Sequence, residues 1–296
     1  MAGIDTSNRT LISPARLNRH GGKRIYWSIV IGTVLIFSAA FLGPLYWMVT
    51  GGLKTGKEIA QIPPTLFPAD PNVGNYKDAW LNLDLGHLLL NTLIYAFGAL
   101  AFQLVFQVAA AFSFSKLRPR FGNVALGLML ATLMIPATVL AIPQYVTVKE
   151  LPIFGWNLLD TPWAIWLVAV TNAFNIFLLK RFFDSIPEEL LSAASVDGAG
   201  PLRTLWSIIL PISRPILGVV AIFSVTATWK DFLWPLLAEP SPENRTVNVG
   251  IYAFGTGAGQ NVVIAAAVIA AIPAVVFFLI FQKNIMSGLT AGSLKG

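Results

Sequence analysis

The most patterned polar segment of the chain is PEELLSAASVDGAGPLRTLWSIILPISRP, which covers residues 187–215 between two apolar stretches. Pro187 is suited to open a helix, and Glu188 and Glu189 then fall in its first turn, where negative charge complements the helix dipole. Gly198 follows as a residue that readily adopts the left-handed conformation that ends helices. The segment therefore predicts a short helix that ends in a sharp bend.

A second helix is predicted directly after this bend. It begins at Pro201 and places its apolar residues at i, i+3, i+4, i+7 and i+8, namely Leu202, Leu205, Trp206, Ile209 and Leu210. Pro211 and Pro215 end or kink it. A helix pair of this kind suits docking into a groove on another protein, with the first, small-residue helix as the inserted element. The alternative is an interfacial hairpin that only links two membrane spans.

Residues for catalysis or metal binding are scarce. The absence of cysteine excludes disulfides, thiolate metal sites and a cysteine nucleophile, and the only two histidines, His20 and His87, lie far apart in the sequence. The stretch GTGAG lacks the Gly-Lys-Ser/Thr ending of a phosphate-binding loop, and neither a zinc-protease helix nor a Gly-x-Ser-x-Gly motif occurs. We therefore expect no catalytic residue, no metal site and no enzyme activity in this chain.

Amide side chains are the main polar groups inside the apolar stretches: Asn91, Gln103, Gln107, Asn172 and Asn175. Amides hydrogen-bond a neutral polyhydroxylated solute without a charge mismatch, and they also join helices to one another. Asn91, Asn172 and Asn175 are thus candidates for a substrate path, with interhelical bonding as the alternative. A carrier driven by protons or sodium would instead need buried charges, of which there are few.

The stretch TWKDFLWP places Lys230 and Asp231 beside Trp229, Phe232 and Trp234 at the end of an apolar run. One interpretation is an interfacial aromatic anchor with charges that reach toward water. The other is a sugar-binding group at the outer gate, in which Trp229 stacks on the ring and the two charged residues bind its hydroxyls. Both interpretations remain open at this point.

The composition indicates a polytopic membrane protein. The 296 residues are 55% hydrophobic and 11% charged, and the mean hydropathy is +0.69, far above that of soluble domains. Apolar runs of about 20 residues are long enough to cross a bilayer as helices. They predict an all-α fold with six spans at about 25–49, 87–113, 123–145, 163–181, 213–237 and 262–281.

The distribution of positive charge predicts the orientation of the spans. Most of the 20 Lys and Arg residues lie in the leader, in the loop SKLRPRFGN, near the 187–215 segment or in the tail, which six spans place on one side. By the positive-inside rule this side is cytoplasmic. Both termini and the helix-turn-helix then face the cytosol, and the net charge of +6 reflects this asymmetry and not nucleic-acid binding. A proline-rich external loop carries a predicted short helix near residues 75–80.

At the segment IPEELLSAASVDGAGPLRTLWSIILPISRP the chain closely resembles the EAA loop of permease subunits in binding-protein-dependent ABC importers. The resemblance extends to GLKTGKEI, the Asn-Tyr pair at 75–76, NTLIYA, AAAFSFSKLRPRFGN, WKDFLWPL and the ending GLTAGSLKG. Together these motifs resemble the maltose-transporter-type inner-membrane component of carbohydrate importers, over about residues 25–296. The organisation implied is a cytoplasmic tail (1–24), a six-helix domain (25–281) with its coupling loop (182–212), and a cytoplasmic tail (282–296).

This resemblance implies a multi-pass protein of a bacterial or archaeal cell membrane, embedded in lipid as a heterodimer with a second permease. Two ATPase subunits would bind ATP and magnesium below it, and an extracytoplasmic solute-binding protein would dock above; the chain itself would hold no cofactor. Carried over position by position, the ATPase contacts would be Ala193, Ala194, Asp197, Gly198, Ala199, Leu210 and Pro211. The tail around Gly288, Lys295 and Gly296 would make a second contact.

Two residues depart from the family pattern. Ser192 occupies the position of the motif glutamate, so a charged contact there is absent or is supplied by Glu188 or Glu189. Lys230 stands where the family usually has asparagine. The function implied is import of a sugar or polyol. The alternative is an anionic sugar or glycerol phosphate, for which Lys230 would bind the phosphate, and an ion-coupled secondary carrier ranks behind both.

Overall fold

The computed structural model describes the backbone of residues 22–291 and the side chains of residues 22–282, and over this range it contains helices and no strand. In chain order the α-helices are α2 (Gly22–Leu53), α3 (Gly56–Ile59), α4 (Gly74–Asn82), α5 (Leu85–Phe112), α6 (Gly122–Thr132), α7 (Ala137–Lys149), α8 (Pro162–Val170), α9 (Ala173–Asp184), α10 (Glu188–Val196), α11 (Pro201–Thr204), α12 (Leu210–Ile212), α13 (Arg214–Lys230), α14 (Leu233–Ala238), α15 (Val247–Gly255) and α16 (Gln260–Ala291). Short π-helical turns lie at Ser113–Leu117 and Leu205–Ile209, and a 3-10 turn lies at Pro242–Asn244. The all-α prediction is confirmed.

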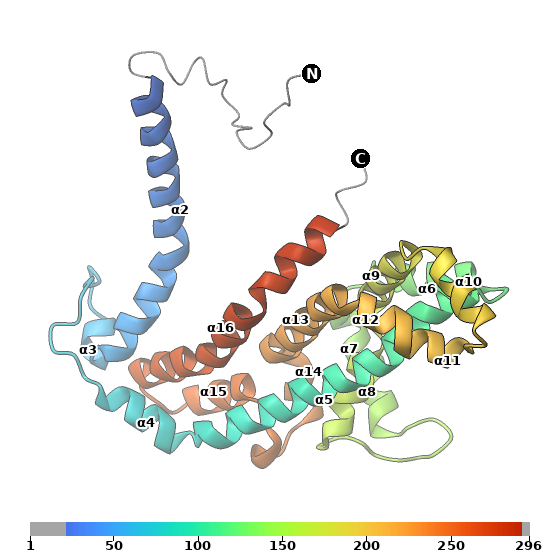
Figure 1. The fold of residues 1–296 in the computed structure, drawn as a ribbon. Helices are drawn as coiled ribbons and strands as arrows, with labels where there is room; N and C mark the ends of the chain where they lie inside the picture. The colour runs from blue at the N-terminus through green and yellow to red at the C-terminus, as the bar shows by residue number, and fades with distance from the viewer. Residues whose placement is uncertain (1–21, 292–296) are drawn as a thin grey trace.

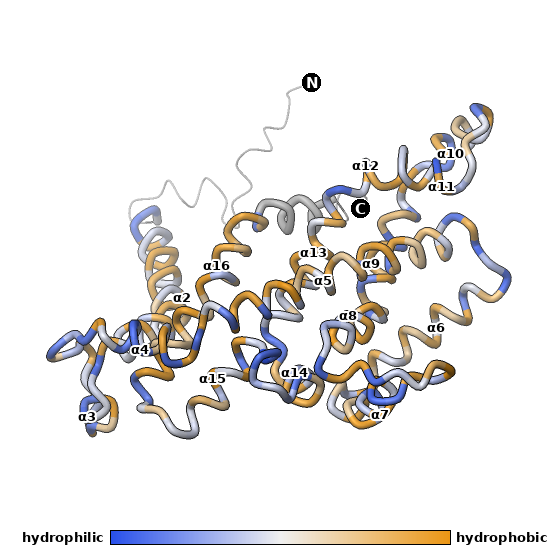
Figure 2. The backbone as a smooth tube through the Cα atoms, turned by 90° about the horizontal axis from the view of Figure 1, so that it is seen from below, coloured by the Kyte–Doolittle hydropathy of each residue, from blue (hydrophilic) through white to orange (hydrophobic). Residues whose placement is uncertain are grey.

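The apolar helices fit a membrane protein of up to six spans. α2, α5 and α16 are each long and apolar enough to cross a bilayer unbroken. Three bent pairs bring the number to six if each pair counts as one span: α6 with α7 at 109°, α8 with α9 at 47°, and the α11–α12 segment with α13 at 81°. Figure 2 shows hydrophobic residues predominating along α2 and α16, whereas hydrophilic residues concentrate in the loops.

Breaks interrupt the predicted spans at 123–145, 163–181 and 213–237, and the sequence analysis did not predict them. Pro136 lies in front of α7 with a ψ of 132°, and a proline disfavours helical backbone in the residue before it. Thr171 and Asn172 separate α8 from α9 with ψ values of 54° and 100°. Asp231 ends α13 with a ψ of 137°. Each break frees backbone groups that a continuous helix would have paired.

Helix α2 stands apart from the other long helices along most of its length and joins them only at its C-terminal end (Figure 1). Asn75 of α4 fixes this end, because its buried Nδ2 donates to the carbonyls of Gly52 (2.9 Å) and Lys54 (2.8 Å). Tyr76 Oη donates to the Val49 carbonyl at 3.0 Å, and Asn261 of α16 donates to Asn75 Oδ1 at 2.9 Å. The Asn-Tyr pair therefore caps the last carbonyls of α2 and ties it to α16.

A buried apolar cluster underlies the helix-turn-helix. It joins α5, α9 and α13 to the π-turn after α11 and consists of Val108, Ala111, Phe112, Ile176, Leu179, Phe183, Ile186, Leu205, Ile209, Ile216, Val219 and Val220. Burial of side chains of this size contributes about 1.5–3 kcal/mol each. The helix-turn-helix is thus anchored on the bundle by buried apolar side chains.

Candidate functional site: a polar cavity and a coupling unit

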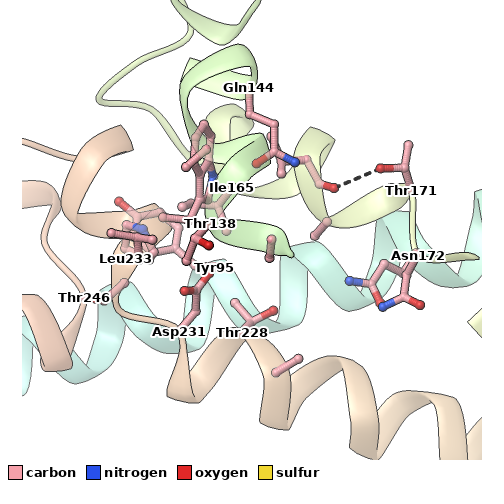
Figure 3. Close-up of a pocket in the computed structure, with 18 residues that line it drawn as sticks. Tyr95, Thr138, Gln144, Ile165, Thr171, Asn172, Thr228, Asp231, Leu233 and Thr246 are labelled. Atoms are coloured by element: carbon pink, nitrogen blue, oxygen red, sulfur yellow. Dashed lines mark hydrogen bonds between the residues drawn. The ribbon is translucent and has the colours of Figure 1, made fainter. Parts of the chain in front are cut away.

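A cavity of about 520 Å³ lies between α5, α7, α8, the start of α9 and the α13–α14 break (Figure 3). Its polar lining consists of hydroxyl and amide side chains with one carboxylate: Tyr95, Gln103, Thr138, Gln144, Thr171, Asn172, Thr228, Asp231 and Thr246. The apolar remainder includes Ile165, Leu233 and Trp234. No lysine or arginine belongs to the lining within the described residues. Such a surface can hydrogen-bond a hydroxylated solute while covering its carbon skeleton.

The helix breaks meet at this cavity. Thr138 comes from the start of α7, Thr171 and Asn172 from the α8–α9 break, and Asp231 from the end of α13. Broken helices at membrane depth are tolerated where they line a water-filled cavity, and in transporters they form substrate sites. Gln107 satisfies one freed group, since its Nε2 donates to the Val170 carbonyl at 2.9 Å.

Two of the six residues predicted for the substrate path line the cavity, namely Asn172 and Asp231. Asn172 is solvent-exposed, and its Oδ1 accepts the Asn175 backbone N–H at 3.0 Å, which caps α9. Asn175 itself is buried and donates to Ser224 Oγ at 3.4 Å. Ser224 in turn donates to Gln103 Oε1. Asn175 therefore joins α9 to α13, as in the interhelical alternative.

The other three candidates lie away from the cavity lining. Asn91 Nδ2 donates to the carbonyls of Glu243 (2.7 Å) and Arg245 (3.2 Å), which fastens the loop between α14 and α15 to α5. Trp229 is buried, and its Nε1 donates to the Ala270 carbonyl of α16 at 3.2 Å. Lys230 is exposed. In this conformation these residues hold helices and loops together or face outward.

Sequence reasoning missed six polar lining residues, Thr138, Gln144, Thr171, Thr228, Tyr95 and Thr246, and it named Gln103 only as an amide within an apolar stretch. One signal for the first two was present, because Pro136 and Pro143 lie beside them inside an apolar run. Hydroxyl groups in an apolar run also bond readily to their own helix, as Thr228 Oγ1 does to the Ser224 carbonyl at 3.1 Å. Their exposure to a cavity is decided by packing.

The predicted bend of the helix-turn-helix is present. Gly198 has a φ of +74°, and the backbone N–H of Ala199 donates to the Ala194 carbonyl at 2.9 Å while that of Gly198 donates to the Ser195 carbonyl at 3.0 Å. This pair of bonds is a Schellman cap. Ala194 is buried against the bundle, whereas Ala193 and Asp197 are exposed. At the far end of the unit, Leu210 packs on the apolar cluster and Pro211 is exposed.

The predicted single apolar stripe of the second helix is wrong. Leu205 and Ile209 are buried in the cluster, whereas Leu202 and Trp206 are 73% and 70% exposed. The segment is also not a regular α-helix, because a π-helical turn at Leu205–Ile209 changes the angle between successive side chains. The stripe is split into an inner pair that anchors the unit and an outer pair that faces away from the chain.

Ser192 stands at the position of the motif glutamate and brings no charge there. Ser192 is exposed, and its Oγ donates to the Glu188 carbonyl of its own helix at 3.1 Å. The Glu188 carboxylate pairs with Arg118 at 2.6 Å, so it is engaged within the chain. Glu189 is exposed and has no ion pair among residues 22–282. The sequence also predicts a contact through the C-terminal tail. Of its residues, Gly288 lies where the structure describes only the backbone, and Lys295 and Gly296 lie outside the described residues.

A buried carboxyl group lies in the loop after α14. Glu239 is 0% exposed, and neither of its carboxyl oxygens has a hydrogen-bond partner among the described residues. Burial, together with the nearby negative charge of Asp160, raises the pKa of Glu239 to about 8. Asp160 itself accepts a hydrogen bond from the Ser241 backbone N–H at 3.2 Å and another from its hydroxyl. Glu239 is therefore largely protonated at neutral pH.

Apolar helices broken around a polar cavity, with an exposed helix-turn-helix at one end, define the membrane-spanning subunit of a solute transporter. Residues 104–290 match the family described as binding-protein-dependent transport system inner membrane component, and the chain belongs to this family. It is accordingly a permease component of an ABC importer and an inner-membrane protein. The family resemblance expected from the 187–215 segment is confirmed.

Individual relatives agree with this assignment. The chain is 30% identical over 287 residues to the sulfoquinovosyl glycerol transport system permease protein SmoH of Agrobacterium fabrum, covering 96% of this chain and 98% of that protein. It is 29% identical to the melibiose/raffinose/stachyose import permease protein MelC of Bacillus subtilis, covering 88% and 94%. A solved bacterial ABC transporter for the acidic polysaccharide alginate has the same fold, with a TM-score of 0.77 at 22% identity over 93% of this chain and 99% of that one.

Proposed function

We propose that this permease forms, with a second permease, the translocation pathway for a sugar or polyol in an importer driven by two ATPase subunits. The observation that carries the proposal is the cavity of about 520 Å³ into which three helix breaks deliver hydroxyl, amide and carboxylate groups. A neutral solute with many hydroxyls matches such a lining, because each hydroxyl both donates and accepts hydrogen bonds. The solute is delivered by the binding protein for which the family is named.

The charge of the cavity favours a neutral solute. Asp231 contributes a carboxylate, whereas Lys230 is exposed and lies outside the lining among the described residues. An anion placed beside Asp231 would be repelled unless a cation from the second permease compensated. An anionic sugar is nevertheless the second candidate, because the relative SmoH carries a name that specifies sulfoquinovosyl glycerol. Uptake of neutral and anionic glycosides by the same vesicles separates the two.

The second permease is proposed from the surface of α2. Its most apolar 18-residue window is 0% buried within the chain, and bulky residues such as Ile36, Phe37 and Phe41 are 70%, 58% and 72% exposed. Lipid alone can cover such a helix. A helix that leaves its own bundle, however, is also free to pack on a partner subunit. The heterodimer therefore gives α2 a packing partner that its own chain does not provide.

ATPase docking is proposed for the outer face of the helix-turn-helix. Val196, Leu202 and Trp206 are 88%, 73% and 70% exposed there. On the first helix of the same unit, the small residues Ser192 and Ala193 are exposed, and so is Glu189. Large apolar groups surrounded by polar residues mark interaction sites. The partner ATPases would bind ATP and magnesium, and this unit, both termini and the tail from Gly288 onward would face the cytosol.

Reconstitution tests the proposal. The chain, its neighbouring permease, the ATPase and the binding protein are co-expressed and placed in proteoliposomes, and uptake of labelled sugars is measured. We expect uptake that needs ATP and the binding protein. Asp231→Asn and Asn172→Ala should each raise the half-saturating solute concentration about 2- to 10-fold, because each removes one hydrogen bond worth about 0.5–1.5 kcal/mol. Asp78→Asn, at an exposed position outside the lining, is the control.

Two results would contradict the proposal. Uptake that follows a proton or sodium gradient without ATP would indicate a secondary carrier. Wild-type affinity in both cavity variants would remove the cavity of this subunit from the substrate path.

A further inference from the structure

The loop between α5 and α6 reaches across to the corner where α9 turns into α10 (Figure 1). Ser115 Oγ donates to Asp184 Oδ1 at 2.7 Å, and Lys116 Nζ donates to the Ile186 carbonyl at 3.0 Å. Arg118 adds an ion pair with Glu188, the first residue of α10, at 2.6 Å. The side chains of residues 115, 116 and 118 thus bind three positions of residues 184–188, which form the corner between α9 and α10.

We propose that these six residues, Ser115, Lys116, Arg118, Asp184, Ile186 and Glu188, form a corner clamp that makes α10 move as one unit with both α9 and α5. The inference rests on the proposed coupling of α10 to an ATPase. It assigns the positioning role to residues outside the docking surface. The clamp transmits a displacement of α10 to two helices at once, instead of to α9 alone.

The backbone of the loop is built for this reach. A π-helical turn at Ser113–Leu117 ends α5, and Arg118 follows in the left-handed conformation with a φ of +48°. Arg118 Nε also donates to the Ser115 carbonyl at 3.2 Å. A residue with a side chain rarely adopts this conformation, and such strain persists only where surrounding contacts stabilise it. Here those contacts are the bonds to the corner.

Burial makes the clamp more than a set of surface charges. Ser115 is 1% exposed, and Asp184 also accepts Lys180 Nζ at 2.7 Å. Ile186 of the corner and Phe183, directly before the corner in α9, are buried with Phe112 of α5 in one apolar cluster. The Arg118–Glu188 pair is itself 68% and 67% exposed, so alone it stabilises little. It locates the start of α10 on a corner that packing and partly buried hydrogen bonds already fix.

The two clamped helices both reach the cavity. α9 begins directly after Asn172, and α5 carries Gln103, which also lines it. Between cavity and clamp, Gln107 of α5 bonds to the Val170 carbonyl at the α8–α9 break. A push on α10 therefore reaches the cavity through two helices, α5 and α9, which the clamp joins at one end, and α5 is bonded to the end of α8 near the cavity.

Charge reversal tests the clamp in the reconstituted complex. The readout is solute imported per ATP hydrolysed, with the binding protein present. Arg118→Glu and Glu188→Arg should each lower this ratio about 2- to 5-fold. Each change replaces an attraction between exposed charges, worth up to about 1 kcal/mol, with a repulsion. The double reversal should restore the ratio. Lys116→Met, which removes the bond to Ile186, should lower it in the same way. Arg120→Glu, at an exposed position of the same loop, should leave it unchanged.

A cross-link gives an independent measurement. Because the chain has no cysteine, the pair Arg118→Cys and Glu188→Cys introduces the only thiols of this subunit. Joining the pair with a reducible bifunctional thiol reagent, which spans the gap that the shortened side chains leave, should keep uptake near that of the untreated pair, because the clamp stays closed throughout transport. Loss of uptake on cross-linking, restored by reduction, would show that this contact opens and would overturn the clamp.

The clamp and the proposed function fail in different ways. If the wild-type complex imports no solute with ATP, the proposed function is wrong. If the wild type imports solute while the single reversals and Lys116→Met keep its ratio of solute to ATP, the clamp alone is wrong. A double reversal as defective as the single ones also contradicts it.

Discussion

Gly198 holds the bend of the helix-turn-helix in the left-handed region, with a φ of +74°, and among the described residues a Cβ added there would meet no atom within 4 Å beyond its chain neighbours. The cost of a side chain at this position is therefore conformational and not steric. For residues other than glycine that cost is about 1–2 kcal/mol. It corresponds to roughly a 5- to 30-fold loss in the ratio of bent to unbent loop.

The matched control is two residues away. Gly200 is equally open, but its φ is −71° and it precedes the first residue of α11 as the N-cap, where serine is preferred. We expect Gly198→Ser to lower solute-stimulated ATPase and uptake several-fold, with normal membrane insertion, and Gly200→Ser to leave both near wild type. Asparagine at position 198 should lie between, because it tolerates the left-handed conformation.

The measurement is ATPase activity with and without the solute-loaded binding protein, in complexes normalised for the amount of this subunit. Full stimulation in Gly198→Ser would refute the reasoning. An equal loss in Gly200→Ser would also refute it, because the conformational cost is confined to position 198.

Three further substitutions probe the fold. Gln107→Leu should lower thermal stability in detergent by about 1–3 kcal/mol, because it leaves the Val170 carbonyl unpaired; an unchanged melting temperature would contradict this. Asn75→Ala removes bonds that join α2 to α4 and α16 and should expose the end of α2 to proteolysis, whereas wild-type resistance would show another anchor. The pKa of Glu239 is raised to about 8 by burial, so the folded state binds more protons than the unfolded state between about pH 4.5 and 8, and stability falls as pH rises through that window. Glu239→Gln should remove this slope, with exposed Glu243→Gln as the control; an unchanged slope would contradict the assignment.

Much of the coupling unit was predictable because its signals are local. A glycine after a short helix, a proline that restarts the chain and carboxylates in the first turn act over a few residues, and the structure has each of them. The stripe from Leu202 to Leu210 was mispredicted because its periodicity assumed a regular α-helix, whereas the segment contains a π-turn at Leu205–Ile209. Packing against the bundle decides which of these side chains are buried. Ser192 was recognised as a departure from the motif, but the engagement of Glu188 by Arg118 joins residues 70 positions apart.

The substrate path shows the same division. The sequence identified polar residues within apolar spans, and Asn172 and Asp231 do line the cavity. It could not separate them from Asn91, Asn175 and Trp229, because an amide or an indole N–H in an apolar segment must find a partner wherever it lies, and only packing decides whether that partner is a helix or a solute.

The sequence by itself determined that the chain is an all-helical membrane protein with an exposed helix-turn-helix, because hydrophobic runs, charge bias and turn residues act through composition and near neighbours. Only the tertiary structure decided that the helix breaks meet at one cavity and that the α5–α6 loop grips the corner before α10. Both depend on contacts between distant segments, and burial in those contacts fixes which of several polar groups face each other.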